Sequence, residues 1–208
     1  MSELTFYTHP MSRGRTIRWM LEEIGQPYRT ELLDYTSTMK APAYLAINPL
    51  GKVPAIRHGD TVVTESAAIC AYLVDAFPAA GLAPALTDPK RGEYYRWLFV
   101  AAGPLEAAIM DQLLGIEVPD DKKAMVGYCH VTEMLKVLET ALSHGDYLLG
   151  SQFSAADIYV GALLGWIASL GMLGQSAVFE GYLQRLSSRP AAIRAQQMDD
   201  ALLGDGHS

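Results

Sequence analysis

Residues 48–73 read NPLGKVPAIRHGDTVVTESAAICAYL, and this stretch decides the fold of the N-terminal part of the chain. The segment VPAIRHGDTVVT predicts two short strands on either side of a Gly-Asp turn. The segment ESAAICAYL predicts a helix that opens with Glu65 and Ser66. Two features need an explanation: Pro54 stands at the head of a strand, and an acid followed by a hydroxyl stands at the head of a helix. Both features also occur as ordinary loop and helix-cap residues, so the residues on either side must show whether they have a function.

Short strand and helix patterns alternate before this stretch. LTFYT at 4–8 and YRTELLD at 28–34 predict strands, and MKAPAYLAI at 39–47 predicts a short helix. The segment SRGRTIRWMLEEIG at 12–25 predicts a longer helix whose apolar side chains share one side: Ile17, Met20, Leu21 and Ile24. Residues 1–76 are therefore expected to form an α/β domain, a mixed sheet with helices packed on it.

The composition changes after this domain. Residues 77–88 are rich in Pro, Ala and Gly and are predicted to be a linker. Residues 89–208 contain no strand pattern and are expected to form an all-helical domain. Helical periodicity runs near 89–114, 121–143, 154–171, 176–187 and 191–199.

Composition and charge exclude several classes of function. Half of the 208 residues are hydrophobic and 19% are charged, which is ordinary for a compact protein and unlike a disordered one. The net charge of −7 argues against general nucleic-acid binding, because that function needs a basic face. No signal peptide is visible. The apolar stretch 155–173 is interrupted by an aspartate and two glycines, so a buried helix is expected there and not a membrane span.

The two cysteines lie far apart and carry no metal-ligand spacing. Cys70 and Cys129 each stand in an apolar helical pattern, which favours two reduced core residues. The five histidines form no ligand pattern either. We therefore expect neither a zinc site nor dithiol chemistry.

Three segments, NPLGKVPAI, TESAAI and FSAADI, occur in an order and at a spacing that resemble the cytosolic glutathione transferases. The resemblance spans nearly the whole chain and points to a bacterial, serine-type member. It implies a thioredoxin-like N-terminal domain and an all-α C-terminal domain. It also implies glutathione as substrate, no metal, and a cytoplasmic homodimer that acts in detoxification. Ser154 and Asp157 in FSAADI have capping-box spacing, and the resemblance gives Asp157 a role in folding.

The resemblance also implies how glutathione is held. A cis Val53-Pro54 bond would let the Val53 backbone pair with the cysteinyl part of glutathione, as an added strand would. Ser66 would bind the γ-glutamyl carboxylate at a helix N-terminus, and Glu65 would face the γ-glutamyl ammonium. Lys52 would pair with the glycyl carboxylate. The alternatives are a trans proline closing a loop, two ordinary helix caps and a solvated lysine.

The thiol-activating residue is expected between the first strand and the first helix. A free cysteine thiol has a pKa of about 8.5, so its thiolate must be stabilised for attack on an electrophile. Ser12 is favoured because a helix N-terminus stabilises a thiolate. Tyr7 is the alternative, at the position of the tyrosine-type transferases, although a strand tyrosine is also normal sheet filling. Thr8 and backbone N–H groups remain further candidates.

Basic residues follow the candidate serine, despite the acidic chain as a whole. Arg13 or Arg15 is expected to attract glutathione or to stiffen the hydrogen bonds around it. Arg18 is expected to face solvent along the helix, as most arginines do. No cysteine lies in this stretch, so the cysteine-type transferases do not fit.

The first helix of the second domain supplies candidates for a hydrophobic substrate pocket. The pocket is assigned to Tyr95, Phe99 and Met110, and Tyr94 and Leu105 stand in the same pattern. An aromatic and Met-rich helix is also typical of plain core. The other face of this helix is expected to build a two-fold dimer.

Three functions are compared. The first is thiolate transfer from glutathione to small hydrophobic electrophiles. The second uses the same site for glutathione-dependent isomerisation, dehalogenation or peroxide reduction. The third is a non-catalytic binding or adaptor protein that keeps the fold. The intact Val53-Pro54 and Glu65-Ser66 pairs favour an enzyme, whereas the ambiguous thiol-activating residue favours the adaptor.

Overall fold

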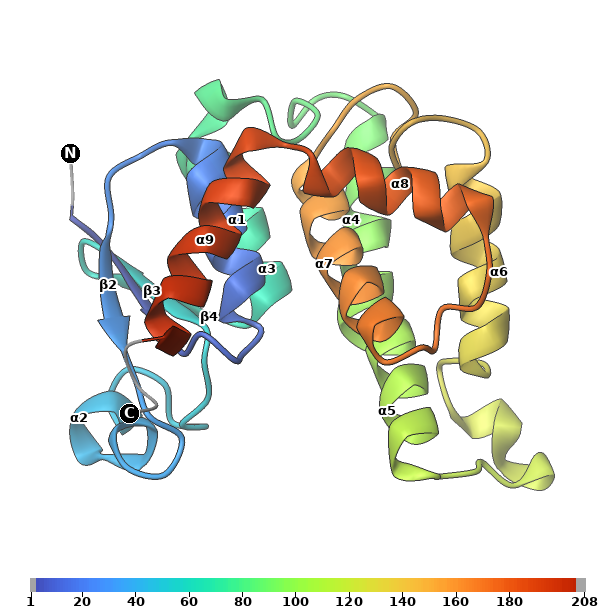
Figure 1. Cartoon of the computed structure of the whole chain (residues 1–208), viewed down its shortest axis with the longest axis horizontal. Coiled ribbons are helices and arrows are strands. Elements are labelled where there is room, and N and C mark those ends of the chain that lie inside the picture. Colours follow the sequence, from blue (N-terminus) through green and yellow to red (C-terminus); the bar gives the residue numbers. More distant parts are fainter. Residues whose placement is uncertain (1–2, 205–208) are drawn as a thin grey trace. The chain divides into compact units, whose positions relative to one another are not determined.

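The computed structural model describes residues 3–204 and divides the chain into two compact units (Figure 1). The first unit contains the residues up to Leu82 together with those from Ser187 onward, and Ala83–Leu186 form the second. The division near Leu82 lies within the segment 77–88 that was expected to be a linker. The C-terminal segment, expected in the helical domain, groups with the first unit because its helix packs along the first helix of the chain.

A four-stranded mixed sheet forms the centre of the first unit. Its order is β2-β1-β3-β4, with bounds Arg29–Leu32, Leu4–Thr8, Ala55–His58 and Thr61–Thr64. β1 pairs in parallel with β2 and antiparallel with β3, which pairs antiparallel with β4. The predicted strands are therefore present, and β3 and β4 flank the predicted Gly-Asp turn.

Three α-helices of some length accompany this sheet: α1 (Gly14–Ile24), α3 (Ser66–Ala76) and α9 (Pro190–Gly204). The predicted apolar face of α1 is buried, and Gly25 ends the helix in the left-handed conformation at φ 69°. The expected helix at 39–47 is shorter: a 3₁₀ turn at Thr38–Lys40 precedes α2 (Pro42–Leu45).

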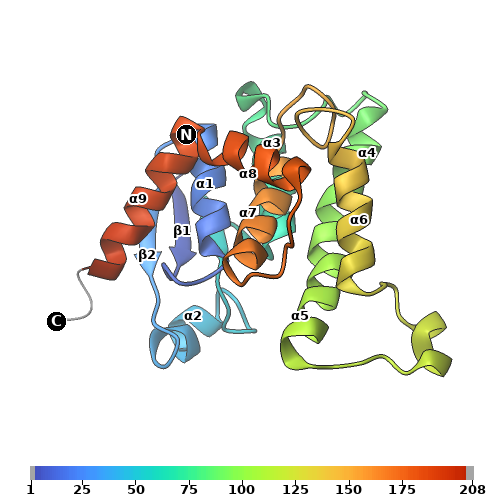
Figure 2. The same cartoon turned by 45° about the vertical axis from the view of Figure 1, so that its right-hand side comes forward.

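Helix α9 lies beside α1, as two views show (Figures 1 and 2). The Arg18 guanidinium donates to the Asp199 carboxylate across 2.7 Å, and both side chains are 1% exposed. The expectation that Arg18 faces solvent is therefore wrong. The opposing carboxylate comes from a helix 181 positions later in the chain, so no local pattern reveals it.

All the long secondary-structure elements of the second unit are helices. They are α4 (Lys90–Val100), a π-helical turn at Ala101–Leu105, α5 (Glu106–Leu114), α6 (Val131–Leu142), α7 (Ala155–Ser169) and α8 (Ala177–Ser187). The π-helical turn contains Pro104, which has no N–H to donate to the helix. The helix expected at 121–143 begins late, because Asp120–Met125 form a 3₁₀ helix and His130 caps α6 by accepting the Thr132 N–H. The predicted fold class, an α/β domain followed by helices, is confirmed.

Asp157 performs the structural role that was expected of it. Its carboxylate accepts hydrogen bonds from the backbone of Ser154 and Leu148 and from the Ser154 and Tyr182 hydroxyls. The reciprocal capping box between Ser154 and Asp157 is complete. Burial raises the pKa of Asp157, and these hydrogen bonds oppose that rise.

Helix α7 is the buried helix that was predicted for the apolar stretch near 155–173. It is 15 residues long, and most of its side chains are buried. Among the described helices, the run Lys90–Leu114 is long and apolar enough to cross a membrane, with a mean hydropathy of 1.2. That criterion tests length and composition only, and core helices also meet it.

The two cysteines differ. Cys70 is buried as expected, and burial raises the pKa of its thiol to about 12. Cys129 is exposed, so its assignment to the core is wrong. The reason is the late start of α6, which leaves Cys129 in the preceding loop.

Candidate functional site

The register of the sheet brings most of the predicted site residues to one edge. Tyr7 of β1 lies opposite Ala55 of β3, and Ala55 lies opposite Thr64 of β4. Since β1 and β4 run in the same direction, their carboxyl ends meet at this edge. The connection from β1 to α1 and the start of α3 follow the ends of β1 and β4, and the Val53-Pro54 pair directly precedes β3, so all three lie at this edge.

The segment before β3 is held in place by hydrogen bonds from side chains of the preceding helix and loop. The Val53-Pro54 peptide bond is cis, as expected. The Lys52 carbonyl accepts hydrogen bonds from the Tyr44 hydroxyl at 2.6 Å and from the Asn48 side chain at 2.8 Å. Among the described residues, neither backbone group of Val53 has a hydrogen-bond partner. Val53 therefore offers one donor and one acceptor to an extended peptide.

Asn48 and Lys40 support this segment although sequence reasoning gave them no role. Asn48 is 2% exposed, and its amide oxygen also accepts the Leu50 N–H. The Lys40 ammonium donates to the carbonyls of Leu50 and Gly51. By contrast, the exposed Lys52 side chain has no hydrogen-bond partner in the described part of the chain, so its charge is available to an anion.

The start of α3 is an open helix N-terminus. Glu65 adopts φ 66° and ψ 122°, and it is the only non-glycine with positive φ among residues 3–204. Such a conformation costs about 1–3 kcal/mol and persists where the surroundings enforce it. The Glu65 side chain does not cap the helix, and the half-buried Ser66 hydroxyl has no partner within the described chain. The first N–H groups of α3 and this hydroxyl can therefore bind an anion.

Ser12 stands at the start of α1 with its hydroxyl already hydrogen-bonded. The hydroxyl donates to the His9 carbonyl at 2.7 Å and accepts the Gly14 N–H at 2.9 Å. A methyl group on Gly14 would lie 1.9 Å from the Thr8 hydroxyl oxygen, so the helix can begin this close to β1 only with glycine. Thr8 is itself fully buried. The Ser12 proton must turn away from His9 before it can reach a substrate.

Tyr7, the alternative thiol-activating residue, is 8% exposed. It belongs to a buried cluster with Met39, Tyr44 and Ala55, and Val53 packs against that cluster. The Tyr7 and Tyr44 ring centroids are 5.7 Å apart. Tyr7 thus serves the core of the sheet and also lies near the backbone that would pair with a peptide.

The two arginines considered for the site are held differently. Arg15 forms an ion pair with Asp200 of α9. Arg13 is half-buried at the start of α1, and its charge lowers the pKa of the Tyr35 phenol. Arg13 is therefore the arginine with an electrostatic effect at this edge.

Tyr35 is a residue of this edge that sequence reasoning missed. Its hydroxyl donates to the Met11 carbonyl at 3.2 Å, and its ring centroid lies 4.5 Å from that of His9. Burial raises the pKa of Tyr35, while the neighbouring Ser12 hydroxyl and the Arg13 charge oppose that rise. One signal could have found it: Tyr35 follows β2, and parallel strands end at the same edge of a sheet.

The residues assigned to a hydrophobic pocket lie on α4 and α5 in the second unit. Tyr95 is half-buried, with its ring centroid 5.4 Å from that of Tyr94. Phe99 is 68% exposed and Met110 is 36% exposed. Tyr94 and Leu105 are fully buried, so the alternative assignment to the core holds for those two.

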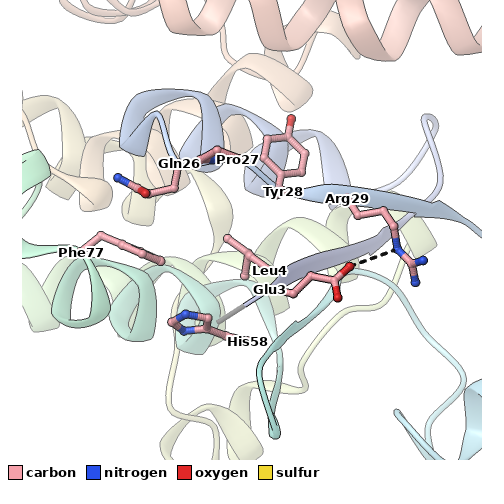
Figure 3. A pocket seen from close by; sticks show the side chains of 8 residues that line it. All are labelled: Glu3, Leu4, Gln26, Pro27, Tyr28, Arg29, His58 and Phe77. Atoms are coloured by element: carbon pink, nitrogen blue, oxygen red, sulfur yellow. Dashed lines mark ion pairs between the residues drawn. The ribbon is translucent and has the colours of Figure 1, made fainter. Parts of the chain in front are cut away.

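A pocket of about 630 Å³ lies at the opposite edge of the sheet (Figure 3). Leu4 of β1 pairs with His58 of β3 at this edge. Figure 3 shows Glu3 and Arg29 facing each other on one side, in an ion pair of 3.9 Å, and Phe77 near His58 on the other. None of the residues assigned to the glutathione site lines this pocket.

Within residues 3–204, no group of three or more His, Cys, Asp or Glu side chains is arranged to hold a metal ion. The sheet register brings together the Val53 backbone, the Ser12 and Ser66 hydroxyls, the Glu65 carboxylate and the basic side chains of Arg13 and Lys52. The open helix N-terminus suits an anionic group, and the unpaired Val53 backbone suits an extended peptide.

Two family models match the chain. The N-terminal domain of glutathione S-transferase matches residues 11–76, and the C-terminal domain of glutathione S-transferase matches residues 130–195. Glutathione S-transferase 3 of Zea mays is 32% identical over 171 residues, which are 76% of this chain and 75% of the maize protein.

Solved structures are also similar to this chain. A glutathione S-transferase from Xylella fastidiosa is 27% identical with a TM-score of 0.78, covering 95% of this chain and 99% of its own. A glutathione transferase homologue from Sulfitobacter, with bound glutathione, is 26% identical with a TM-score of 0.73 and the same two coverages.

Proposed function

The chain belongs to the glutathione S-transferase family, and we propose that it is an enzyme that binds glutathione and stabilises its thiolate for attack on small hydrophobic electrophiles. The observation that carries the proposal is the shared sheet edge. There, the unpaired backbone of Val53 comes just before β3, and the open N-terminus of α3 comes just after the neighbouring strand β4. The bound glutathione of the Sulfitobacter homologue supports the choice of ligand.

In this proposal the peptide is held at both ends and in the middle. The Val53 backbone pairs with the cysteinyl residue, and Pro54 fixes the approach of that strand. Ser66 and the first N–H groups of α3 bind the γ-glutamyl carboxylate, while Glu65 faces the γ-glutamyl ammonium. The Lys52 ammonium pairs with the glycyl carboxylate. The open α3 N-terminus and the unpartnered Lys52 ammonium support these roles.

The chemistry requires the thiol to lose a proton to solvent. Its sulfur then forms a bond to an electrophilic carbon, and the electron pair leaves with a departing group or moves into the acceptor. Lowering the thiol pKa by about two units amounts to about 2.7 kcal/mol of thiolate stabilisation. A hydrogen bond to the charged sulfur and the dipole of α1 can supply much of that.

We keep Ser12 as the proposed donor, with Tyr7 as the alternative. Ser12 stands at a helix N-terminus, and rotation of its hydroxyl away from the His9 carbonyl would direct the proton to a sulfur atom. Arg13 adds positive charge beside it. Tyr7 has the support of its packing near Val53.

The second substrate and the setting are also proposals. We assign the electrophile to apolar side chains of the second unit, with Tyr95, Phe99 and Met110 as contacts. The exposure of Phe99 and Met110 supports this, because both are open to a ligand or partner. We further propose that the protein is a cytoplasmic homodimer with a role in detoxification, as the sequence resemblance to the cytosolic glutathione transferases implies.

Calorimetric titration with glutathione tests the binding site. Wild type should bind saturably, and Ser66→Ala should weaken binding about 10- to 150-fold, because a hydrogen bond to a charged group is worth about 1.5–3 kcal/mol. Ser169→Ala is the matched control, since that hydroxyl only donates to the Trp166 carbonyl within α7. No saturable binding in wild type would leave the adaptor function in place of the enzyme.

A further inference from the structure

Two hydroxyl groups meet at the start of α1, and only one of them comes from the segment expected to activate the thiol. Ser12 lies in the connection from β1 to α1, whereas Tyr35 lies in the loop after β2. The phenol donates to the Met11 carbonyl, the residue directly before Ser12. The Ser12 hydroxyl lies near enough to the Tyr35 phenol to lower its pKa.

The existing hydrogen bonds make Tyr35 the more available donor. A hydroxyl has one proton, and that of Ser12 is held by the His9 carbonyl at 2.7 Å. The Tyr35 bond to the Met11 carbonyl is 3.2 Å long, which is longer than the usual O–H···O distance of about 2.5–3.0 Å, so this bond is weak. A phenol, with an ordinary pKa of about 10, is also a stronger donor to an anion than an aliphatic hydroxyl.

The loop that carries Tyr35 is fixed immediately before it. The Asp34 carboxylate accepts hydrogen bonds from the backbone N–H groups and the hydroxyls of both Thr36 and Ser37. The Asp34 N–H donates to the Thr38 hydroxyl at 2.7 Å. Tyr35 is 47% exposed, so a rigid loop presents a phenol that solvent and ligand can reach.

The groups around the phenol keep it positioned and protonated. The His9 ring packs against the Tyr35 ring, and its Nδ1 accepts the Met11 N–H at 3.1 Å. Arg13 is the charged group that acts on the phenol, and Ser12 is the neighbouring hydroxyl. Because burial raises the pKa of Tyr35 despite both, the phenol carries its proton at neutral pH.

We propose that Tyr35 is a catalytic residue whose phenol donates a hydrogen bond to the thiolate of bound glutathione, as a second donor beside Ser12. The inference rests on the proposed function. The phenol keeps its proton throughout: it exchanges the Met11 carbonyl for the sulfur as acceptor, and the thiol proton leaves to solvent.

The test is a pH titration of the glutathione thiolate absorbance on wild type, Tyr35→Phe and Ser12→Ala. Tyr35→Phe keeps the ring against His9 and removes only the hydroxyl. The pKa of the bound thiol should rise by about one unit, so at pH values below that pKa the variant should hold about tenfold less thiolate. At pH values below the pKa of the bound thiol the dissociation constant of glutathione should stay near the wild-type value, and above that pKa linkage should weaken binding by up to about tenfold. Tyr72→Phe is the matched control, because its hydroxyl contacts His58 at the opposite edge.

A fluorotyrosine at position 35 distinguishes a purely structural role of the phenol from hydrogen-bond donation to the thiolate. A more acidic phenol should lower the pKa of the bound thiol below the wild-type value, whereas a residue that merely holds Met11 should leave it unchanged. A wild-type thiol pKa that is depressed and stays so in Tyr35→Phe would overturn the role of Tyr35 alone. A wild type that does not lower the thiol pKa would overturn the transferase function and this role together.

Discussion

Arg18 of α1 and Asp199 of α9 form an ion pair that is sealed from solvent, with each side chain 1% exposed. The guanidinium also stands over the Phe6 ring, 5.2 Å from its centroid. One nitrogen of Arg18 and one carboxylate oxygen of Asp199 have no further partner among the described residues. The pair joins the C-terminal helix to the helix that carries Ser12 at its start.

Removing one member of this pair should destabilise the first unit strongly. Asp199→Ala leaves a buried guanidinium without its counter-charge, and we expect a loss of about 3–5 kcal/mol in the free energy of unfolding. Urea denaturation measures it. Asp200→Ala is the control, because its pair with Arg15 is 49% and 38% exposed and should contribute at most about 1 kcal/mol. Equal losses in both variants would contradict the role assigned to burial.

A methyl group at position 14 should disturb the start of α1. In Gly14→Ala the new carbon would overlap the buried Thr8 hydroxyl, so we expect a loss of about 1–3 kcal/mol in the free energy of unfolding. Gly181→Ala, inside α8, meets no atom within 4 Å and should stabilise by up to about 1 kcal/mol. Thermal unfolding of both variants decides it, and a stabilised Gly14→Ala would refute the close contact.

The loop that carries Tyr35 should be sensitive to acid. Hydrogen bonds from Thr36 and Ser37 lower the pKa of Asp34 from 3.8 to about 2. A carboxyl with a depressed pKa stabilises the fold above its unfolded pKa, and that contribution is lost as pH falls through the folded value. The difference in Tm between wild type and Asp34→Asn should therefore shrink between about pH 4 and pH 2. A difference that stays constant over this range would contradict the hydrogen-bond assignment.

The native protein should expose one thiol to reagents. Cys129 is exposed and should react, whereas buried Cys70 should react only after unfolding. Burial and the Glu133 charge raise the pKa of Cys129. Its labelling rate should therefore reach half of its maximum at a higher pH than the rate of a free cysteine does. Glu133→Gln should increase the rate at neutral pH. Labelling with an aromatic disulfide measures both stoichiometry and rate, and two reactive thiols in the native state would contradict the burial of Cys70.

The sequence was sufficient where local rules decide the structure. The alternation in VPAIRHGDTVVT, the apolar face of α1 and the Ser154-Asp157 capping box depend on neighbours a few residues away, and all are confirmed. The cis Val53-Pro54 bond was predicted from the family resemblance and is also confirmed.

The misses have two physical causes, long-range pairing for Arg18 and Tyr35 and a local helix start for Cys129. Arg18 was placed in solvent because its partner, Asp199, lies at the other end of the chain. Cys129 was placed in a helix because helical periodicity does not reveal that the cap at His130 starts the helix late. Tyr35 was overlooked because only the parallel pairing of β2 with β1 brings it to the edge where Ser12 lies.

The central claim is that this sheet edge binds glutathione and lowers the pKa of its thiol. The most direct measurement is the pH dependence of the glutathione thiolate absorbance on wild type, Ser12→Ala and Tyr7→Phe. We expect a bound-thiol pKa about two units below the free value of about 8.5, rising in Ser12→Ala and unchanged in Tyr7→Phe. A rise in Tyr7→Phe alone would reverse the assignment of the donor. A bound thiol that titrates like free glutathione in wild type would contradict the claim itself.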